Sequence, residues 1–277
     1  MQIEVIIEKK SHKLDAEEGK TILETLQEHG IHVLTAPCGG RGRCGKCTVE
    51  VEHMGEVLAC MTKVTDGMRI TIPKVQLRAQ KSKIAENGTV THYPADDGEG
   101  LDAACDIGTT TVVCHLIDGK TGEKLATVSE PSAQRSFGAD VLSRIQAAEA
   151  GKLEILKEQI IFQIAQMLRT LQKKTGRGEQ IQRLAVVGNT VMCHLFAGIS
   201  PVSIGVTPFM PQEFFGKEYT GEQLGLTDCR SVYIAPAVAG FVGGDITSDL
   251  LAVMQKNPKE KVLLLDIGTN GEMANRE

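Results

Sequence analysis

Hydrophobic and polar positions alternate with the period of a strand at the amino end of the chain, and the period then changes to that of a helix. Residues 2–7 and 12–14 alternate in this way, so we expect two paired strands. Residues 21–28 place apolar side chains at helical spacing ahead of Gly30, which predicts a short helix. Further apolar runs predict short strands at residues 48–51, 57–59 and 69–72. Residues 1–78 thus have the pattern of a small sheet that holds a helix, a β-grasp fold of the α+β class.

A second pattern follows a polar stretch. Residues 79–100 contain few apolar side chains and end in an acidic, glycine-containing segment, so we expect a linker there. From residue 101 to residue 277 apolar strands alternate with helical patterns, which predicts an α/β domain with a largely covered sheet. The longest helical pattern places apolar side chains on one face, namely Leu153, Leu156, Ile160, Ile164, Met167 and Leu171. The expected strands are 101–118 with a break at Gly108, 123–129, 181–187, 232–235 and 261–265.

Composition and charge exclude several classes of protein. The formal net charge is -5, which argues against a general nucleic-acid binder, because phosphate contacts need a surplus of basic side chains. No apolar run is long enough to cross a bilayer, and the amino end has no secretory pattern. We therefore expect a cytoplasmic protein that binds neither nucleic acid nor a membrane.

The eight cysteines fall into two sets. Thiols in a reducing compartment act more often as metal ligands or core residues than as disulfides. Four cysteines lie close together in sequence: Cys38, Cys44, Cys47 and Cys60. The other four are scattered in apolar surroundings or single loops and are predicted to be ordinary buried or semi-buried thiols: Cys105, Cys114, Cys193 and Cys229.

The segment that carries the first three clustered cysteines is rich in glycine and in basic residues. Three thiolates from one loop can reach a metal cluster only if the backbone wraps tightly with its amides turned inward, which the intervening glycines permit. Arg41, Arg43 and Lys46 would offset the negative charge of a cluster with four thiolates. A zinc site and a set of unliganded thiols are the alternatives, although zinc sites more often use two separated cysteine pairs.

This cysteine pattern resembles that of plant-type 2Fe-2S ferredoxins. It differs from that pattern in having five residues instead of four between Cys38 and Cys44, and a short gap of twelve residues before Cys60. Plant-type clusters have reduction potentials near roughly −400 mV, so the resemblance implies a donor of single electrons.

The string Asp-Ile-Gly-Thr occurs twice, each time at the end of an apolar strand and 160 residues apart. Such a string can be a plain hairpin turn. Two copies favour phosphate binding instead, because glycine admits a phosphate to the backbone, threonine donates hydrogen bonds, and aspartate can orient Mg²⁺ or a water. The candidate residues are Asp106, Gly108, Thr109, Thr110 and Thr111 in the first copy, and Asp266, Gly268, Thr269, Asn270 and Gly271 in the second.

The duplicated string resembles the actin, Hsp70 and sugar-kinase (ASKHA) superfamily, whose lobes have a ribonuclease H-like fold. Together with the cysteine loop and the segments 187–195 and 239–245, it resembles the ferredoxin-fused ATPases that reductively activate corrinoid proteins. The resemblance implies that the four clustered cysteines hold a 2Fe-2S cluster and that both strings hold ATP and Mg²⁺. It also implies catalytic roles for Asp106, Asp245 and Asp266.

The function implied by this resemblance is ATP-dependent transfer of one electron to the cobalt of a corrinoid protein. The expected partners are that corrinoid protein and an unidentified low-potential electron donor, and a homodimer is left open. The family continues with a second lobe, whereas this sequence stops at Glu277, so we expect the ATPase domain to be incomplete. The alternative function is a non-catalytic ferredoxin-type electron carrier whose α/β domain only docks a partner.

Three further residues have both a structural and a functional interpretation. Asn189 fits either a helix cap or a ligand site. His194 lies in an apolar helix and is predicted to be a core histidine. Asp245 is predicted to cap the helix that follows it, which is compatible with a place near the nucleotide.

Overall fold

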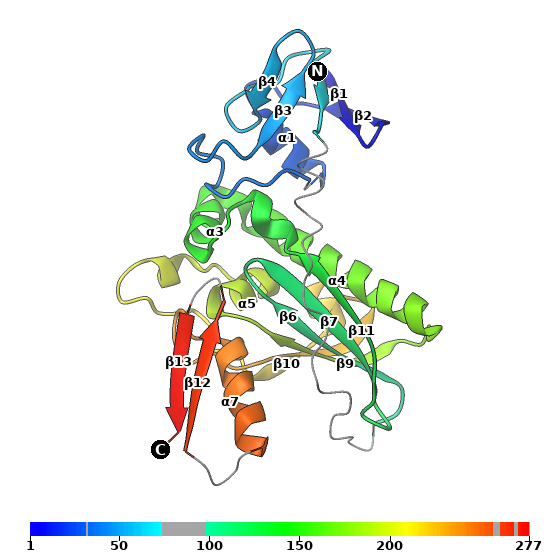
Figure 1. Cartoon of the computed structure of the whole chain (residues 1–277), viewed down its shortest axis with the longest axis vertical. Coiled ribbons are helices and arrows are strands. Elements are labelled where there is room, and N and C mark those ends of the chain that lie inside the picture. Colours follow the sequence, from blue (N-terminus) through cyan, green and yellow to red (C-terminus); the bar gives the residue numbers. More distant parts are fainter. Residues whose placement is uncertain (32, 74–97, 257–260, 269–270, 277) are drawn as a thin grey trace. The chain divides into compact units, whose positions relative to one another are not determined.

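The structure is a computed structural model that describes residues 1–31, 33–73, 98–256, 261–268 and 271–276. These residues form two compact units (Figure 1). The first unit combines the amino-terminal residues up to 73 with residues 133–147, and the second holds residues 98–132 and the described residues from 148 onward. The predicted linker lies mostly outside the described residues, and the domain limits inferred from the sequence remain a prediction.

The first unit is built around a five-stranded sheet of order β2-β1-β5-β3-β4, in which only β1 and β5 run parallel. Helix α1 (Ile22–Glu28) begins at Thr21, whose hydroxyl accepts from the Glu24 backbone N–H while the Glu24 carboxylate accepts from the Thr21 backbone N–H. Val5, Leu26 and Ile70 are fully buried in its core. The β-grasp prediction is therefore confirmed. The strands are β1 (Gln2–Ile7), β2 (Lys10–Asp15), β3 (Thr48–Val51), β4 (Gly55–Leu58) and β5 (Arg69–Thr71).

Residues 133–147 complete this first unit, although the sequence pattern places them in the second domain. They form a 3₁₀ helix (Ala133–Ser136) and helix α3 (Val141–Ala147). The buried Gln27 amide donates to the Ser136 carbonyl at 2.8 Å, and the Ala139 N–H donates to the Pro37 carbonyl at 3.2 Å. These bonds join residues about a hundred positions apart, so no local periodicity could have predicted them.

The second unit contains a six-stranded sheet of order β10-β11-β9-β6-β7-β8. Its three central strands β11, β9 and β6 are parallel, and the outer pairs are antiparallel. Five of the six side chains in the predicted apolar stripe of helix α4 (Leu153–Thr175) are completely buried, which confirms that helix and its buried face. The strands are β6 (Leu101–Ile107), β7 (Thr111–Asp118), β8 (Lys124–Pro131), β9 (Ile181–Val187), β10 (Lys217–Thr220) and β11 (Cys229–Ile234).

The remaining elements of this unit are helices and a separate hairpin. The hairpin β12–β13 lies beside α7 (Figure 1). The elements are a π-helical turn (Ala148–Lys152), α4 (Leu153–Thr175), α5 (Thr190–Ala197), a 3₁₀ helix (Val202–Gly205), α6 (Gly221–Leu224), α7 (Gly244–Lys256), β12 (Val262–Ile267) and β13 (Gly271–Arg276). None of the helices in the described residues has the length and apolar character needed to span a membrane.

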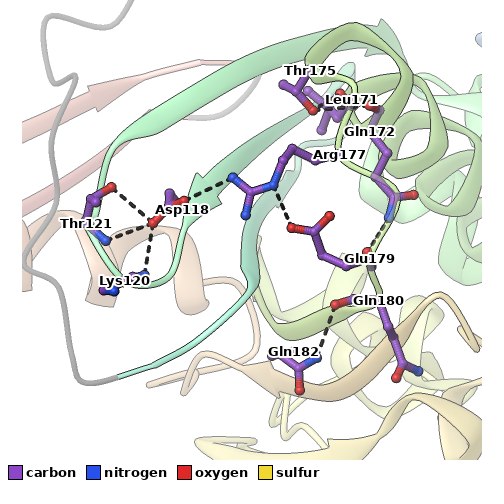
Figure 2. A network of polar contacts seen from close by, with 10 residues as sticks. All are labelled: Asp118, Lys120, Thr121, Leu171, Gln172, Thr175, Arg177, Glu179, Gln180 and Gln182. Atoms are coloured by element: carbon purple, nitrogen blue, oxygen red, sulfur yellow. Dashed lines mark hydrogen bonds and ion pairs between the residues drawn. The ribbon is translucent and has the colours of Figure 1, made fainter.

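A polar network ties the β7–β8 turn to the end of α4 (Figure 2). The Asp118 carboxylate accepts from the Lys120 and Thr121 backbone N–H groups and from the Arg177 guanidinium at 3.1 Å. Arg177 also donates to Glu179 at 2.6 Å. The Thr121 N–H and Arg177 lower the pKa of Asp118 to about 2. This network holds the end of strands β6 and β7 that is opposite to the Asp-Ile-Gly-Thr turn.

Candidate functional site

The four clustered cysteines lie as two pairs in the first unit. The Sγ atoms of Cys38 and Cys44 are 3.3 Å apart, and those of Cys47 and Cys60 are also 3.3 Å apart. Cys38 and Cys44 are partly exposed, whereas Cys47 and Cys60 are buried. The loop before β3 thus supplies three thiols, and the turn after β4 supplies the fourth.

Backbone amides point at the thiols. Burial opposes ionisation of Cys38, but hydrogen bonds from Cys44 and from the Arg43 and Arg41 backbone N–H groups outweigh it and lower the pKa of this thiol to about 6. Burial and the neighbouring Cys47 raise the pKa of Cys60 to about 11, against a hydrogen bond from the Gly42 N–H. The site therefore offers one thiolate readily and would gain the others when a cation binds.

Gly42 shows why the loop needs glycine. Its φ is +68°, and an added Cβ would lie 2.8 Å from the Met61 Sδ. A side chain here would be strained by the backbone and would displace the methionine that covers the loop.

The arrangement of the thiols fits a two-metal cluster. A 2Fe-2S cluster is held by four cysteines, hence two per iron, and the four thiols form two pairs. Within the described residues, no three His, Cys, Asp or Glu side chains converge on a single ion position. The zinc alternative requires four ligands around one ion, so the geometry supports it less well.

In the second unit, the candidate phosphate residues lie at one edge of the large sheet. Strands β6 and β9 are parallel, so their carboxyl ends meet at the same edge, where ligands bind in open α/β sheets. Asp106 lies at the end of β6, and Asn189 follows β9. The Asn189 amide donates to the Thr109 hydroxyl at 3.1 Å, which joins the two turns directly.

Backbones approach closely at this edge. A Cβ on Gly243 would lie 2.4 Å from both the Gly188 carbonyl oxygen and the Thr190 amide nitrogen, so only glycine fits. The Asp245 N–H reaches the Gly188 carbonyl at 3.3 Å, and the Thr190 hydroxyl donates to the Ala239 carbonyl at 2.6 Å. The start of α7 is thereby fixed against the start of α5.

Five carboxylates from four elements face this edge and influence one another: Asp106, Asp245, Asp249, Asp266 and Glu272. We refer to them as the carboxylate group. The crowding of protein atoms around Asp106, followed by the charges of Asp245, Asp249 and Asp266, raises its pKa to about 7, although water reaches its side chain. Desolvation is the main cause that raises the pKa of Asp245, Asp249 and Glu272, and neighbouring carboxylates raise it further. For Asp245, hydrogen bonds from backbone N–H groups act in the opposite direction. Mutual repulsion of this kind would be relieved by a bound divalent cation.

Of the two interpretations of Asn189, the helix cap is confirmed, and the ligand site stays a prediction. Its side-chain oxygen accepts from the Met192 N–H at 3.0 Å and caps α5, while its amide contacts Thr109. His194 is a core histidine as predicted, since it is fully buried and its Nδ1 lies 2.7 Å from the Thr190 carbonyl oxygen. Burial lowers the pKa of His194.

Asp245 does not cap its helix as the sequence suggested. Helix α7 begins at Gly244, so Asp245 lies inside the first turn, where its carboxylate accepts from the Ile246 N–H at 2.9 Å. The helix thus starts two residues earlier than a cap at Asp245 would place it. Gly243 and Gly244, just before Asp245, pack closely against the backbone of Gly188 and Thr190 and against Ala235. As a result, the carboxylate is left to face the other acids.

Sequence reasoning missed Asp249 as a site residue, and it did not assign a role to Glu272. For both residues the sequence contains a pattern from which they could have been predicted. Asp249 follows Asp245 by four positions and so lies on the same helical face, and Glu272 is the register partner of Asp266 across the β12–β13 hairpin.

The second copy of the string is only partly described. Asp266 ends β12, Gly268 follows it, and Gly271 begins β13. Thr269 and Asn270 lie outside the described residues. In the first copy Thr109 is buried and Thr110 is exposed.

Two models of known protein families match the chain. Residues 101–257 match the family described as the RACo middle region. Residues 4–74 match a 2Fe-2S iron-sulfur cluster binding domain.

Three longer proteins are similar to the chain. The corrinoid activation enzyme RamQ of Eubacterium limosum is 28% identical over 320 residues, which cover 87% of this chain and 54% of that protein. The Co(II) methylated amine-specific corrinoid protein reductase of Methanosarcina barkeri is 28% identical over 189 residues, 62% of this chain and 33% of that protein. A solved structure titled reductive activator for corrinoid, iron-sulfur protein matches with a TM-score of 0.61 and 25% identity, covering 99% of this chain and 61% of that one. The chain thus spans less than two thirds of the length of each of these relatives.

Proposed function

Because the chain belongs to the family of proteins with a RACo middle region and carries a 2Fe-2S iron-sulfur cluster binding domain ahead of it, we propose that it is an ATP-dependent reductive activator of a corrinoid protein. The observation that carries this proposal is the pairing of four thiols, three of them from a basic glycine loop, on the same chain as a carboxylate-lined α/β edge. Relatives named as corrinoid activators support the choice of partner.

In the redox half of the proposal, Cys38, Cys44, Cys47 and Cys60 hold the two irons. A bound 2Fe-2S cluster supplies one electron at low potential. The Arg41 and Arg43 amides stabilise negative charge on the Cys38 sulfur, and the buried Cys47 and Cys60 keep water from one side. Cobalt in the Co(II) state gains that single electron and becomes Co(I).

In the nucleotide half, the Asp-Ile-Gly-Thr turns with Thr109, Thr110, Thr111, Thr269 and Asn270 hold phosphates. Because no three acids of the described residues converge on one ion position, Mg²⁺ is held by one or two members of the carboxylate group together with those phosphates. Asp106, Asp245 and Asp266 orient the metal and its waters. ATP can promote electron transfer only if it binds the docked arrangement more tightly than the resting one. The position of Asn189 between Thr109 and α5 supports such a link, because phosphate binding at Thr109 would act on that helix.

The redox half is tested by purifying the chain without oxygen and counting iron per chain. We expect two irons, a reducible EPR signal with S = 1/2, and loss of both in Cys60→Ser. Cys229→Ser, a buried thiol of the second unit, is the matched control and should keep the signal. One zinc per chain, or no metal, would contradict the proposal.

The nucleotide half is tested by thermal unfolding with and without Mg-ATP. We expect Mg-ATP to raise the Tm of the wild type, and Asp106→Ala to abolish the shift without altering the cluster spectrum. Glu222→Gln, an exposed acid on α6, serves as the control. Two irons without any shift from Mg-ATP would favour the alternative function, a ferredoxin-type electron carrier with an α/β docking domain.

A further inference from the structure

The chain is acidic overall, yet its two cysteine segments contain no carboxylate. It has 35 acidic against 30 basic residues, but no Asp or Glu occurs between Glu28 and Glu50 or between Glu56 and Asp66. The cations of these two segments are Arg41, Arg43, Lys46 and Lys63. The local sign of charge around the thiols is therefore opposite to that of the whole chain.

The cysteine loop presents this charge to solvent around an apolar centre. Arg41, Arg43 and Lys46 are exposed, and Met61 is 63% exposed. The contact between Gly42 and the Met61 Sδ places the methionine against the loop between the two arginines. Methionine and arginine are enriched in protein interfaces.

One segment that contacts the loop, residues 133–147, does not cancel the charge. Residues 133–147 contact the loop at Gly39, where a Cβ would lie 3.3 Å from the Phe137 carbonyl oxygen. This segment carries one carboxylate, Asp140, against Arg135 and Arg144. It therefore adds no net negative charge.

The more exposed thiol pair lies in this basic loop. Cys38 and Cys44 are partly exposed, whereas Cys47 and Cys60 are buried. An electron leaves a metal centre most readily where the path to the acceptor is shortest, which here is through the edge formed by Cys38 and Cys44.

We propose that Arg41, Arg43, Lys46 and Met61 form the docking surface through which the iron-sulfur unit meets its electron acceptor, and that this acceptor is a protein with carboxylates around its own metal centre. The inference rests on the proposed function, since it needs an electron to transfer. Opposite charges steer such an encounter and raise its association rate, while the methionine supplies the apolar contact at its centre. The reduced iron-sulfur site gives up one electron and is oxidised, and the metal ion of the acceptor takes up that electron, so its oxidation state falls by one.

Small redox probes of opposite charge test the sign of this surface. The holoprotein is reduced with dithionite, freed of excess reductant, and mixed in a stopped-flow instrument with the anion Fe(III)–EDTA or with the cation hexaamminecobalt(III). Each probe accepts one electron. Ionic strength is varied from about 0.1 to about 0.5 M, where the Debye length is about 10 Å or less, so that only charges near the site influence the rate.

We expect the rate with the anion to fall roughly threefold across this range and the rate with the cation to rise. The triple variant Arg41→Gln, Arg43→Gln and Lys46→Gln should remove both trends. The matched control replaces Lys9, Lys10 and Lys13 by Gln at the β1–β2 hairpin, on the opposite edge of the sheet, and should leave both trends intact. Iron content and the EPR spectrum of each variant show whether the site is still assembled.

A rate with the anion that rises with salt, as the overall charge of -5 would predict, overturns the docking surface while the proposed function stands. A triple variant with the wild-type trends overturns it as well. Protein without iron overturns both proposals.

Discussion

Asp106 has two opposing features, because protein atoms crowd its carboxylate while water still reaches it. Its pKa of about 7 lies above the ordinary value, so folding favours the protonated form. A carboxyl group of this kind destabilises the folded state as the pH rises from about 4 to about 7. Without a bound cation, the ionised Asp106 carboxylate therefore lowers the stability of the folded state at neutral pH. A bound divalent cation would relieve this cost.

We expect Asp106→Asn to stabilise the metal-free protein at pH 8 and to have little effect near pH 4. The gain should be about 1 kcal/mol, well below the ~4 kcal/mol to which the whole pKa displacement converts, because solvent screens the exposed carboxylate. Urea unfolding at both pH values in EDTA measures it. Millimolar Mg²⁺ should reverse the order by stabilising only the wild type. A variant less stable than the wild type at pH 8 without metal would contradict this explanation.

Asn189 combines a helix cap with a contact to Thr109. Replacing it by Ala should cost about 2 kcal/mol, since both the cap and a buried hydrogen bond are lost. Asn189→Ser keeps an oxygen for the cap and should cost less than half as much. Equal losses in urea unfolding would show that the cap contributes nothing.

At the scale of elements, the cysteine loop is shaped by positive φ angles. Gly42 and Gly45 have φ of +68° and +65°, but only Gly42 has a neighbour, Met61, where a Cβ would be placed. A side chain at Gly45 would therefore cause backbone strain alone, whereas one at Gly42 would cause backbone strain and a clash with Met61.

Gly45→Ala should destabilise the first unit by about 1 kcal/mol through backbone strain alone, and Gly42→Ala should cost more and lower the iron content. In the double variant Gly42→Ala, Met61→Ala the stability should return to that of Gly45→Ala. Urea unfolding and the iron-to-protein ratio check this. No recovery in the double variant would show that Met61 is not the obstacle.

At the scale of the whole molecule, the chain has two units with separate cores. The core around α1 draws its buried residues from positions 3–72, while the second unit buries the stripe of α4 against its own sheet. The thiols belong to the first unit and the carboxylate group to the second.

We therefore expect two transitions in calorimetry, each sensitive to a different ligand. Mg²⁺ at a hundred times its Kd should stabilise only the second unit, by about 2.7 kcal/mol, because its proposed site lies in the folded carboxylate group. Loss of the cluster in Cys60→Ser should lower only the other transition. A single transition moved by both changes would mean that the units fold as one.

Much of this protein was determined by its sequence alone. Strand and helix periods depend on local geometry, so the β-grasp pattern, the α/β alternation and the stripe of α4 could be predicted. The four thiols could also be found from sequence, because a loop of fixed length limits how far apart its ligands can lie.

The tertiary structure decided the rest. Asp249 and Glu272 join the carboxylate group only because α7 packs beside β9 and β12 and because β13 pairs with β12. Residues 133–147 join the first unit through hydrogen bonds to Gln27 and Pro37. Such contacts depend on how distant elements pack, and no local periodicity encodes them. The raised pKa of Asp106 has the same origin, since carboxylates far apart in sequence repel one another only after folding has gathered them.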